Sequence, residues 1–220
     1  MKKIIFLVMA AALAGLVGCN PFGKGDIKVT EYKDSVVVIP SPEKQNLPKG
    51  LLLGKVQSAE GKDKAEKNML SQFASNTRAM LCADRDNIMI YLYPDAVTYY
   101  RKQNPDLSDS ELEDAMFGKI CDSLSRVQNM SNHGIHVEIV VSTLERRVQR
   151  GDDIFIVFNV TGNLCGNILY AYMPKYESTL GISSNGGKNW SFMRIYEDTP
   201  DILRISYPDE VVNAVMGNNR

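Results

Sequence analysis

Apolar side chains in residues 64–83 recur every three to four positions, which is the period of one face of an α-helix. The positions on that face are Met69, Leu70, Phe73, Thr77, Met80 and Leu81. A second helix is predicted from residue 108 to about 127, because Ser108 and Glu111 have the spacing of a capping box. The first half of the folded region is therefore expected to be helical.

The second half of the chain changes to a period of two, which is typical of strands. Four segments are predicted as strands: 134–148, 154–160, 176–183 and 190–196. Residues 154–160 (IFIVFNV) are nearly all apolar, so this strand is expected to be central and covered on both faces. Residues 168–173 are either a further strand or an insertion, and a short helix is predicted at about 209–216. Helices followed by an antiparallel meander make an α+β fold, with N-terminal helices packed on a curved antiparallel sheet of about four strands.

The first residues have the pattern of a targeting segment. Lys2 and Lys3 precede an uncharged apolar run over residues 4–17, which is shorter than the roughly 20 residues that a helix needs to span a bilayer. The run ends in Leu16-Val17-Gly18-Cys19, which resembles the lipobox of bacterial lipoproteins. This resemblance implies cleavage before Cys19 and a diacylglyceryl group on its thiol. An ordinary signal peptide with an incidental cysteine, and an uncleaved N-terminal helix, are the alternatives.

The lipobox resemblance divides the chain into three parts. Residues 1–18 are the expected lipoprotein signal peptide, and residues 19–63 are the lipidated cysteine and a Pro- and Gly-rich tether that leads into the domain. Residues 64–220 are the expected single α+β domain. Two or more acyl chains on Cys19 suffice for stable anchoring. Asn20 follows the cysteine instead of aspartate, which favours the outer membrane of the cell envelope.

The charge balance limits the class of partner. The whole chain has 25 basic and 26 acidic residues and a formal net charge of -1. Removing the leader takes away Lys2 and Lys3, which makes the mature chain more acidic. We therefore expect no general nucleic-acid binding, which needs a basic face, and no anchoring by a polybasic patch. The arginines Arg146, Arg147 and Arg150 are predicted to form a solvated strand end.

The order of elements over residues 64–196 resembles the cystatin-like, cone-shaped fold of the nuclear transport factor 2-like superfamily. The turn at Asp84 to Asp86 and the break at Tyr93-Pro94-Asp95 lie where that family separates its first helices from the sheet. The resemblance implies a long helix and shorter helices packed into a strongly bent sheet, with polar residues lining a cavity. Residues 161–175 depart from the pattern.

One hairpin has a motif of its own. Residues 183–190 (SSNGGKNW) resemble the Asp-box of sialidase-type propellers, with Asn185 in place of the acid and Asn189 in place of the threonine. In those families the motif braces a hairpin and carries no catalysis, and a propeller would need several copies. We predict a tight hairpin with Trp190 packed beside it.

The remaining thiols leave two arrangements open. With Cys19 lipidated, Cys82, Cys121 and Cys165 are an odd number, so at least one stays free outside the cytoplasm. Small buried cysteines are one arrangement, and a Cys82–Cys121 disulfide is the other. No Cys-x-x-Cys motif occurs, and we expect neither a metal nor another cofactor.

Candidate pocket residues are His136, Glu138, Asp153, Tyr99 and Trp190. His136 and Glu138 share a strand face because side chains alternate with period two. An acid–base pair of His136 with Glu138 or Asp153 is one interpretation, and a solvated sheet face is the other.

Two functions follow from these patterns. The first is a non-catalytic envelope lipoprotein that binds a small ligand or a partner protein, with no catalytic residues. The second is a small cavity enzyme that uses the His136 pair. A cavity filled by Phe155, Phe158, Met173 and Trp190 would count against the enzyme.

Overall fold

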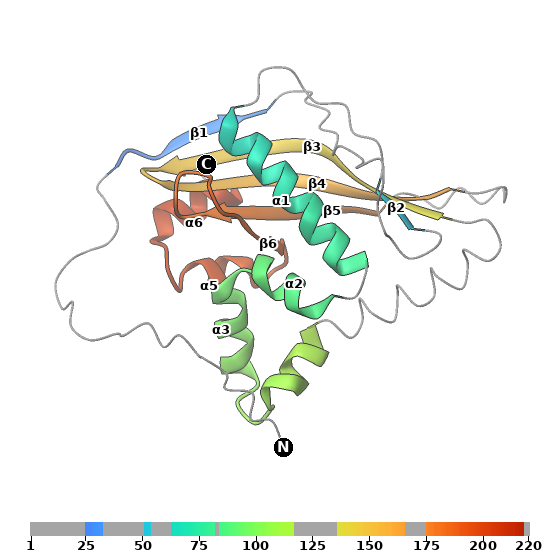
Figure 1. The fold of residues 1–220 in the computed structure, drawn as a ribbon. Coiled ribbons are helices and arrows are strands. Elements are labelled where there is room, and N and C mark those ends of the chain that lie inside the picture. Colours follow the sequence, from blue (N-terminus) through green and yellow to red (C-terminus); the bar gives the residue numbers. More distant parts are fainter. Residues whose placement is uncertain are drawn as a thin grey trace.

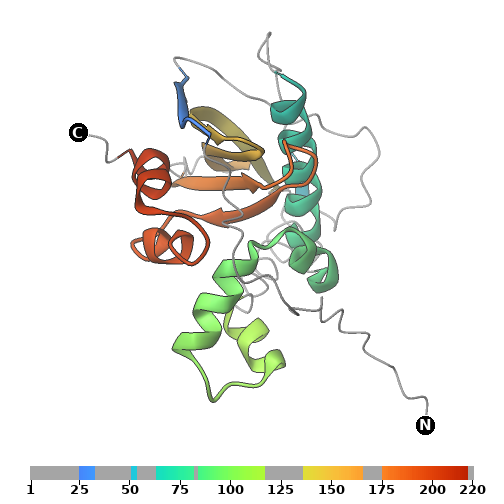
Figure 2. The ribbon, with the colours of Figure 1, turned by 90° about the vertical axis from the view of Figure 1, so that its left-hand side faces the viewer.

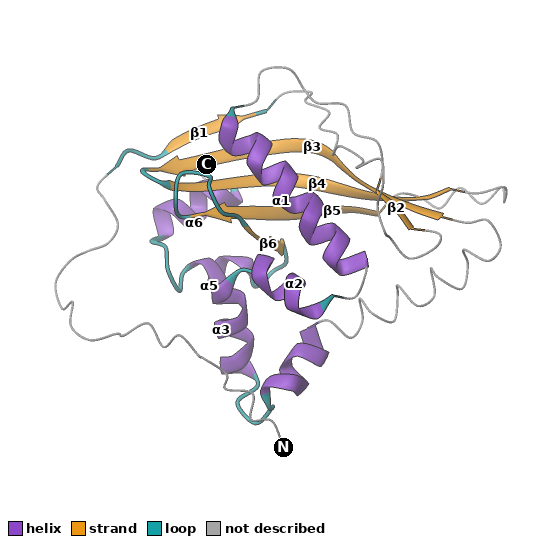
Figure 3. Ribbon diagram, viewed as in Figure 1, coloured by secondary structure: helices purple, strands orange, loops and turns teal. Residues whose placement is uncertain are grey.

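The computed structural model describes residues 25–32, 51–53, 63–81, 84–116, 136–165 and 175–217. In chain order its elements are β1 (Lys28–Glu31), β2 (Leu51–Leu53), α1 (Lys64–Leu81), α2 (Arg85–Tyr91), α3 (Pro94–Gln103), β3 (His136–Arg150), β4 (Asp153–Cys165), β5 (Lys175–Ser183), β6 (Ser191–Arg194), α5 (Thr199–Leu203) and α6 (Asp209–Met216). Residues 109–116 form a further helix. The fold is α+β, as the sequence predicts, and Figure 3 shows its helices and strands.

Among the described residues, six strands form one sheet, where about four were expected. Five of them follow the order β1-β3-β4-β5-β6, and each pairs with its neighbours antiparallel. β2 pairs with β3 in parallel, beside the first half of β3, whereas β1 lies beside its second half. Both added strands come from the range expected to be a tether and lead-in to the domain. The predicted segment 168–173 lies outside the described residues.

The sheet carries helices on both faces. Figure 2 shows the strands between α1 on one side and α5 with α6 on the other, and Figure 1 labels the same elements from the front. The predicted packing of N-terminal helices on the sheet describes only one face, that of α1, because α5 and α6 from the C-terminal end cover the other. The helix predicted at 209–216 is confirmed as α6, whereas α5 was not predicted.

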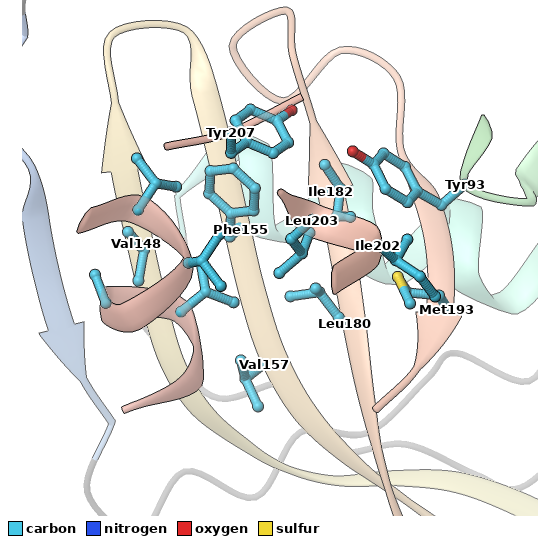
Figure 4. Close-up of a cluster of buried hydrophobic side chains, with 14 of the residues drawn as sticks. Tyr93, Val148, Phe155, Val157, Leu180, Ile182, Met193, Ile202, Leu203 and Tyr207 are labelled. Carbon is cyan, nitrogen blue, oxygen red and sulfur yellow. The ribbon is translucent and has the colours of Figure 1, made fainter. Parts of the chain in front are cut away.

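β4 is the central strand and its side chains fill both layers. Ile154, Ile156 and Phe158 face α1, and the residues between them, Phe155 and Val157, face α5 and α6. All five are buried, which confirms the prediction of a strand covered on both faces. Figure 4 shows the α5–α6 layer, where the rings of Phe155 and Tyr207 meet edge to face at 4.8 Å.

The α1 layer uses the apolar face that the sequence predicts. Met69, Leu70, Phe73 and Thr77 are buried. The ring of Phe73 lies 4.9 Å from Phe158, edge to face. Aromatic pairs in this geometry add about 0.5–1.5 kcal/mol to the burial of their surface.

Local signals fix several helix ends. Asp84 caps α2 by accepting a hydrogen bond from the backbone N–H of Asn87, and Pro94 opens α3 where its missing N–H costs nothing. The capping box is confirmed: the Ser108 backbone N–H donates to Glu111 at 2.8 Å, and the Glu111 N–H donates to the Ser108 hydroxyl at 3.3 Å. The part of the predicted helix beyond residue 116 lies outside the described residues.

Candidate functional site

The hairpin between β5 and β6 is braced by its own side chains. The Asn185 side-chain oxygen accepts hydrogen bonds from the backbone N–H groups of Lys188 and Asn189, at 3.1 and 2.9 Å. The Ser183 hydroxyl accepts one from Gly187 at 3.0 Å. Trp190 is buried, and its indole N–H donates to the Gly187 carbonyl at 3.0 Å. The predicted brace is confirmed, with Asn185 in the place of the usual acid.

The brace also holds the hairpin against α1. Gly187 has a φ of 82°, and a Cβ built on it would lie 2.4 Å from the Ala65 Cβ. The Asn68 side-chain amide donates to the carbonyls of Gly187 and Lys188, both at 2.7 Å. Glycine is therefore required at 187 both by its backbone angle and by the space available.

The structure separates His136 from Asp153. The backbone of His136 lies opposite Cys165 at the start of β3, and Asp153 lies opposite Arg150 at the other end of the same hairpin. The length of β3 puts about 40 Å or more between them. The two residues cannot form one acid–base pair within a chain. Glu138 lies near His136 along β3, and the side chains of both are outside the described part of the molecule.

Tyr99 and Trp190 lie in different layers. Trp190 belongs to the apolar cluster under α1, whereas Tyr99 packs at the edge of the cluster under α5 and α6. Tyr99 contacts the Tyr100 ring edge to face at 5.6 Å. The five predicted pocket residues therefore do not converge on one site.

The structure instead places Asp153 in a group of tyrosines and charged residues. Tyr207 and Tyr93 approach each other with their phenol oxygens in Figure 4, and Tyr93 donates a hydrogen bond to Asp95 at 2.6 Å. Asp153 lies close enough to Tyr207 for its charge to raise the pKa of the Tyr207 hydroxyl. Arg150 stands beside Asp153, with Nη2 lying 3.6 Å from a carboxylate oxygen of Glu210. We call this set the Tyr93–Asp153 cluster.

The electrostatics of this cluster follow from burial. Burial raises the pKa of Tyr93, and its hydrogen bond to Asp95 raises it further. Burial also raises the pKa of Tyr207, with the charges of Asp153 and Asp95 adding to it. Both phenols therefore stay protonated at neutral pH and act as hydrogen-bond donors. A nucleophile or general base needs the opposite shift, and the hydroxyl of Tyr93 instead donates to the Asp95 carboxylate.

The pKa of Asp153 is raised above its ordinary value. Burial is the largest cause that raises its pKa, the neighbouring Asp152 adds to the rise, and Arg150 opposes it. Arg150 has Nε and Nη1 buried without a hydrogen-bond partner among the described residues. Perturbed groups in a cluster can mark a functional site, although structural ion-pair networks have the same signature.

We expect Asp153→Asn to be more stable than the parent at neutral pH. A carboxyl group whose pKa is higher in the folded state stabilises the fold when protonated, and this contribution is lost as pH rises through the folded pKa. Asparagine mimics the protonated form at every pH. The difference in unfolding free energy should therefore shrink as pH falls below the ordinary aspartate pKa of about 3.9. Urea denaturation between pH 3 and 8 measures it, and a parent more stable than the variant at pH 7 would contradict the expectation.

A second charged network was missed by the sequence analysis. Glu66 on α1 is buried and accepts a hydrogen bond from the Tyr32 hydroxyl. It also forms an ion pair with Arg147 of β3 at 3.1 Å. Arg147 also pairs with Asp63. The expectation of a solvated strand end is wrong here, because the Arg147 side chain is only 13% exposed. The available signal was Glu66, a carboxylate on the apolar face of the helix, which requires a buried partner.

Among the described residues, no group of three or more histidine, cysteine, aspartate or glutamate side chains is placed to hold a metal ion. None of the helices there is long and apolar enough to cross a membrane. No protein-family model, curated protein or solved structure matches this chain.

Proposed function

We propose that this protein is a lipid-anchored binding protein of the bacterial cell envelope, held by acyl chains on Cys19. The proposal rests first on the order of the basic residues, the apolar run and the Leu16-to-Cys19 lipobox at the N-terminus. The mature chain would begin at Cys19, six residues before the described region. Asn20 makes the outer membrane the proposed location.

The packing of the domain supports binding at its surface. Phe155 and Phe158 fill the two layers on either side of β4, and Trp190 closes the layer beside α1; each is at most 2% exposed. These three side chains occupy space in the two layers that a bound ligand would otherwise take. Met173, also named as a possible cavity filler, lies outside the described residues. Ile90 and Tyr196 are large apolar residues that stay exposed and are available to a small ligand or a partner protein.

The cone of the nuclear transport factor 2-like superfamily stays a prediction. In that cone, helices line the hollow of one bent sheet, whereas here helices cover both faces of the described sheet. The proposed function does not depend on this resemblance. The enzyme hypothesis loses Asp153 as a partner of His136, since the two lie at opposite ends of the β3–β4 hairpin, and the side chains of His136 and Glu138 lie outside the described part of the molecule.

The experiment that tests the anchor is Cys19→Ser. We expect the variant to lose metabolically incorporated palmitate, to keep its uncleaved leader, and to leave the outer-membrane fraction of the cell envelope. Mass spectrometry of the N-terminal peptide and membrane fractionation measure these changes. Cys82→Ser is the matched control and should keep lipid and location. A Cys19→Ser protein that remains acylated and processed at the same place would refute the proposal.

A further inference from the structure

The described chain begins at one end of the sheet. Gly25 lies against the backbone of Gly151 in the β3–β4 turn, where a Cβ on Gly25 would be 3.2 Å from the Gly151 nitrogen. The β5–β6 hairpin turns at the same end, because the Gly186 N–H donates to the Asp152 carbonyl at 2.8 Å. We call this end, defined by Gly25, Gly151, Asp152 and Gly186, the turn end. The far end is where β3 begins and β2 pairs with it.

The link between the lipid and the turn end is short. Residues 20–24 separate Cys19 from Gly25, so a fully extended chain would bridge at most about 20 Å. β3 alone has 15 residues and is about 50 Å long. A link shorter than the domain restricts which part of the domain can approach the bilayer. Residues 19–63 were expected to be the tether that leads into the domain, but β1 lies within this range and already belongs to the sheet.

We propose, on the basis of the lipid anchor proposed above, that the turn end faces the bilayer and the far end stands away from it. The occupant of this surface is the lipid headgroup layer at which the Cys19 acyl chains enter. The exposed charged residues near the turn end are of both signs; they include the acidic Asp26, Asp63, Asp152 and Glu210 and the basic Lys28, Lys64 and Lys188. The short link, and not attraction to anionic lipid, sets the orientation.

One competing orientation is defined by α1. Its exposed residues Lys64, Lys67 and Arg78 are basic, and an anionic bilayer could attract this helix along its length. In that case the domain would lie flat on α1. The two orientations differ in the position of the two ends of α1, because α1 runs from the turn end, where Ala65 meets Gly187, to the far end, where it contacts β2.

The test measures the height of both ends of α1 above the bilayer. A clickable non-canonical residue replaces Lys64 or Arg78 in the full chain, which is purified in its lipidated form, labelled with a donor fluorophore and reconstituted. The vesicles consist of phosphatidylethanolamine and phosphatidylglycerol with acceptor-labelled headgroups. The two sites are about 20 Å apart along α1, so we expect roughly twofold higher energy transfer from position 64 than from position 78.

A lengthened link identifies the cause. Inserting a Gly/Ser segment of about 30 residues after Asn20 gives a flexible linker with a mean span of about 30 Å, and the difference between the two positions should then vanish. Equal transfer with the native link would overturn the proposal in favour of a domain lying flat. A difference that survives the insertion would also overturn it, because the surface of the domain would then set the orientation.

Failure of the anchor gives a separate result. If Cys19 carries no lipid, the mature protein does not float with the vesicles, and neither position transfers energy above the level of a chain that begins at Asn20 and has neither leader nor lipid. That outcome refutes the proposed function. Protein that floats with the vesicles but shows the wrong pattern of transfer refutes only the orientation.

Discussion

Truncating Phe158 to alanine is expected to lower the free energy of unfolding by about 3–5 kcal/mol. Phe158 is fully buried, and its ring lies edge to face with Phe73 at 4.9 Å and with Phe192 at 6.4 Å. The change removes apolar surface, leaves a cavity between β4 and α1, and deprives two other rings of their partner. Among the residues that the structure describes, truncating an exposed side chain would not cause all three of these losses.

Urea denaturation of the mature chain measures the effect of Phe158→Ala. Ile90→Ala is the matched control, because Ile90 is 67% exposed on α2 and should change the unfolding free energy by no more than about 0.5 kcal/mol. The slope of unfolding free energy against urea concentration should stay the same in both variants. A loss below about 1 kcal/mol for Phe158→Ala would mean that the α1 layer is not packed as described.

The sequence predicts this core because its signals are local and repetitive. The run over residues 154–160 has apolar side chains on both strand faces, and residues 64–81 repeat with helical period, so each pattern determines its own element. β1 has no such pattern: Lys28–Glu31 are all exposed and are held by backbone pairing with β3. α5 has five residues, too few for a helical period to show.

The candidate site was less predictable than the fold. Alternation along a strand assigns a side chain to a face, and on that basis His136 was placed beside Glu138, with Asp153 as an alternative partner. It does not determine which residues meet across the β3–β4 hairpin, and the register places these two at opposite ends. The hairpin brace was predictable because Ser183, Asn185 and Trp190 interact within a few residues of one another.

Arg147→Met is expected to cost about 3–5 kcal/mol, the loss seen when one partner of a buried ion pair is removed. Arg147 connects β3 to α1 through Glu66 and Asp63, and its Nη2 also donates to Gln149 at 3.0 Å. Methionine keeps much of the side-chain volume but removes the charge. Glu66, whose side chain is 8% exposed, would then stay buried with Tyr32 as its remaining side-chain partner.

Arg204→Met is the matched control for Arg147→Met. Arg204 also pairs with two carboxylates, Asp201 and Asp209, both at 2.8 Å, but its side chain is 46% exposed. Exposed pairs contribute about 0–1 kcal/mol, so the control should lose no more than that. Equal losses in the two variants would show that burial does not determine how much the Arg147–Glu66 pair contributes to the free energy of unfolding.

The pH dependence of Arg147→Met has a definite sign. Burial alone would raise the pKa of Asp63, but the Glu66 backbone N–H and the Arg147 guanidinium outweigh it and lower that pKa. A carboxylate with a lowered folded pKa stabilises the fold above its unfolded pKa of about 3.9, and the contribution is lost as pH falls through the folded value. Arg147→Met lacks the share of this stabilisation that Arg147 gives to the Asp63 carboxylate. The difference in unfolding free energy between the parent and the variant should therefore shrink below about pH 4.

The double variant Arg147→Met/Glu66→Met separates a lost attraction from a stranded charge. If most of the cost of Arg147→Met is the burial of an unpaired Glu66 carboxylate, removing that carboxylate as well should recover part of the stability, because apolar side chains of similar volume often replace a buried pair at little cost. If the two losses simply add, Glu66 is not stranded by the loss of Arg147. The network would then stabilise the domain through attraction between its charges, and the contact between α1 and β3 would depend on the pair itself.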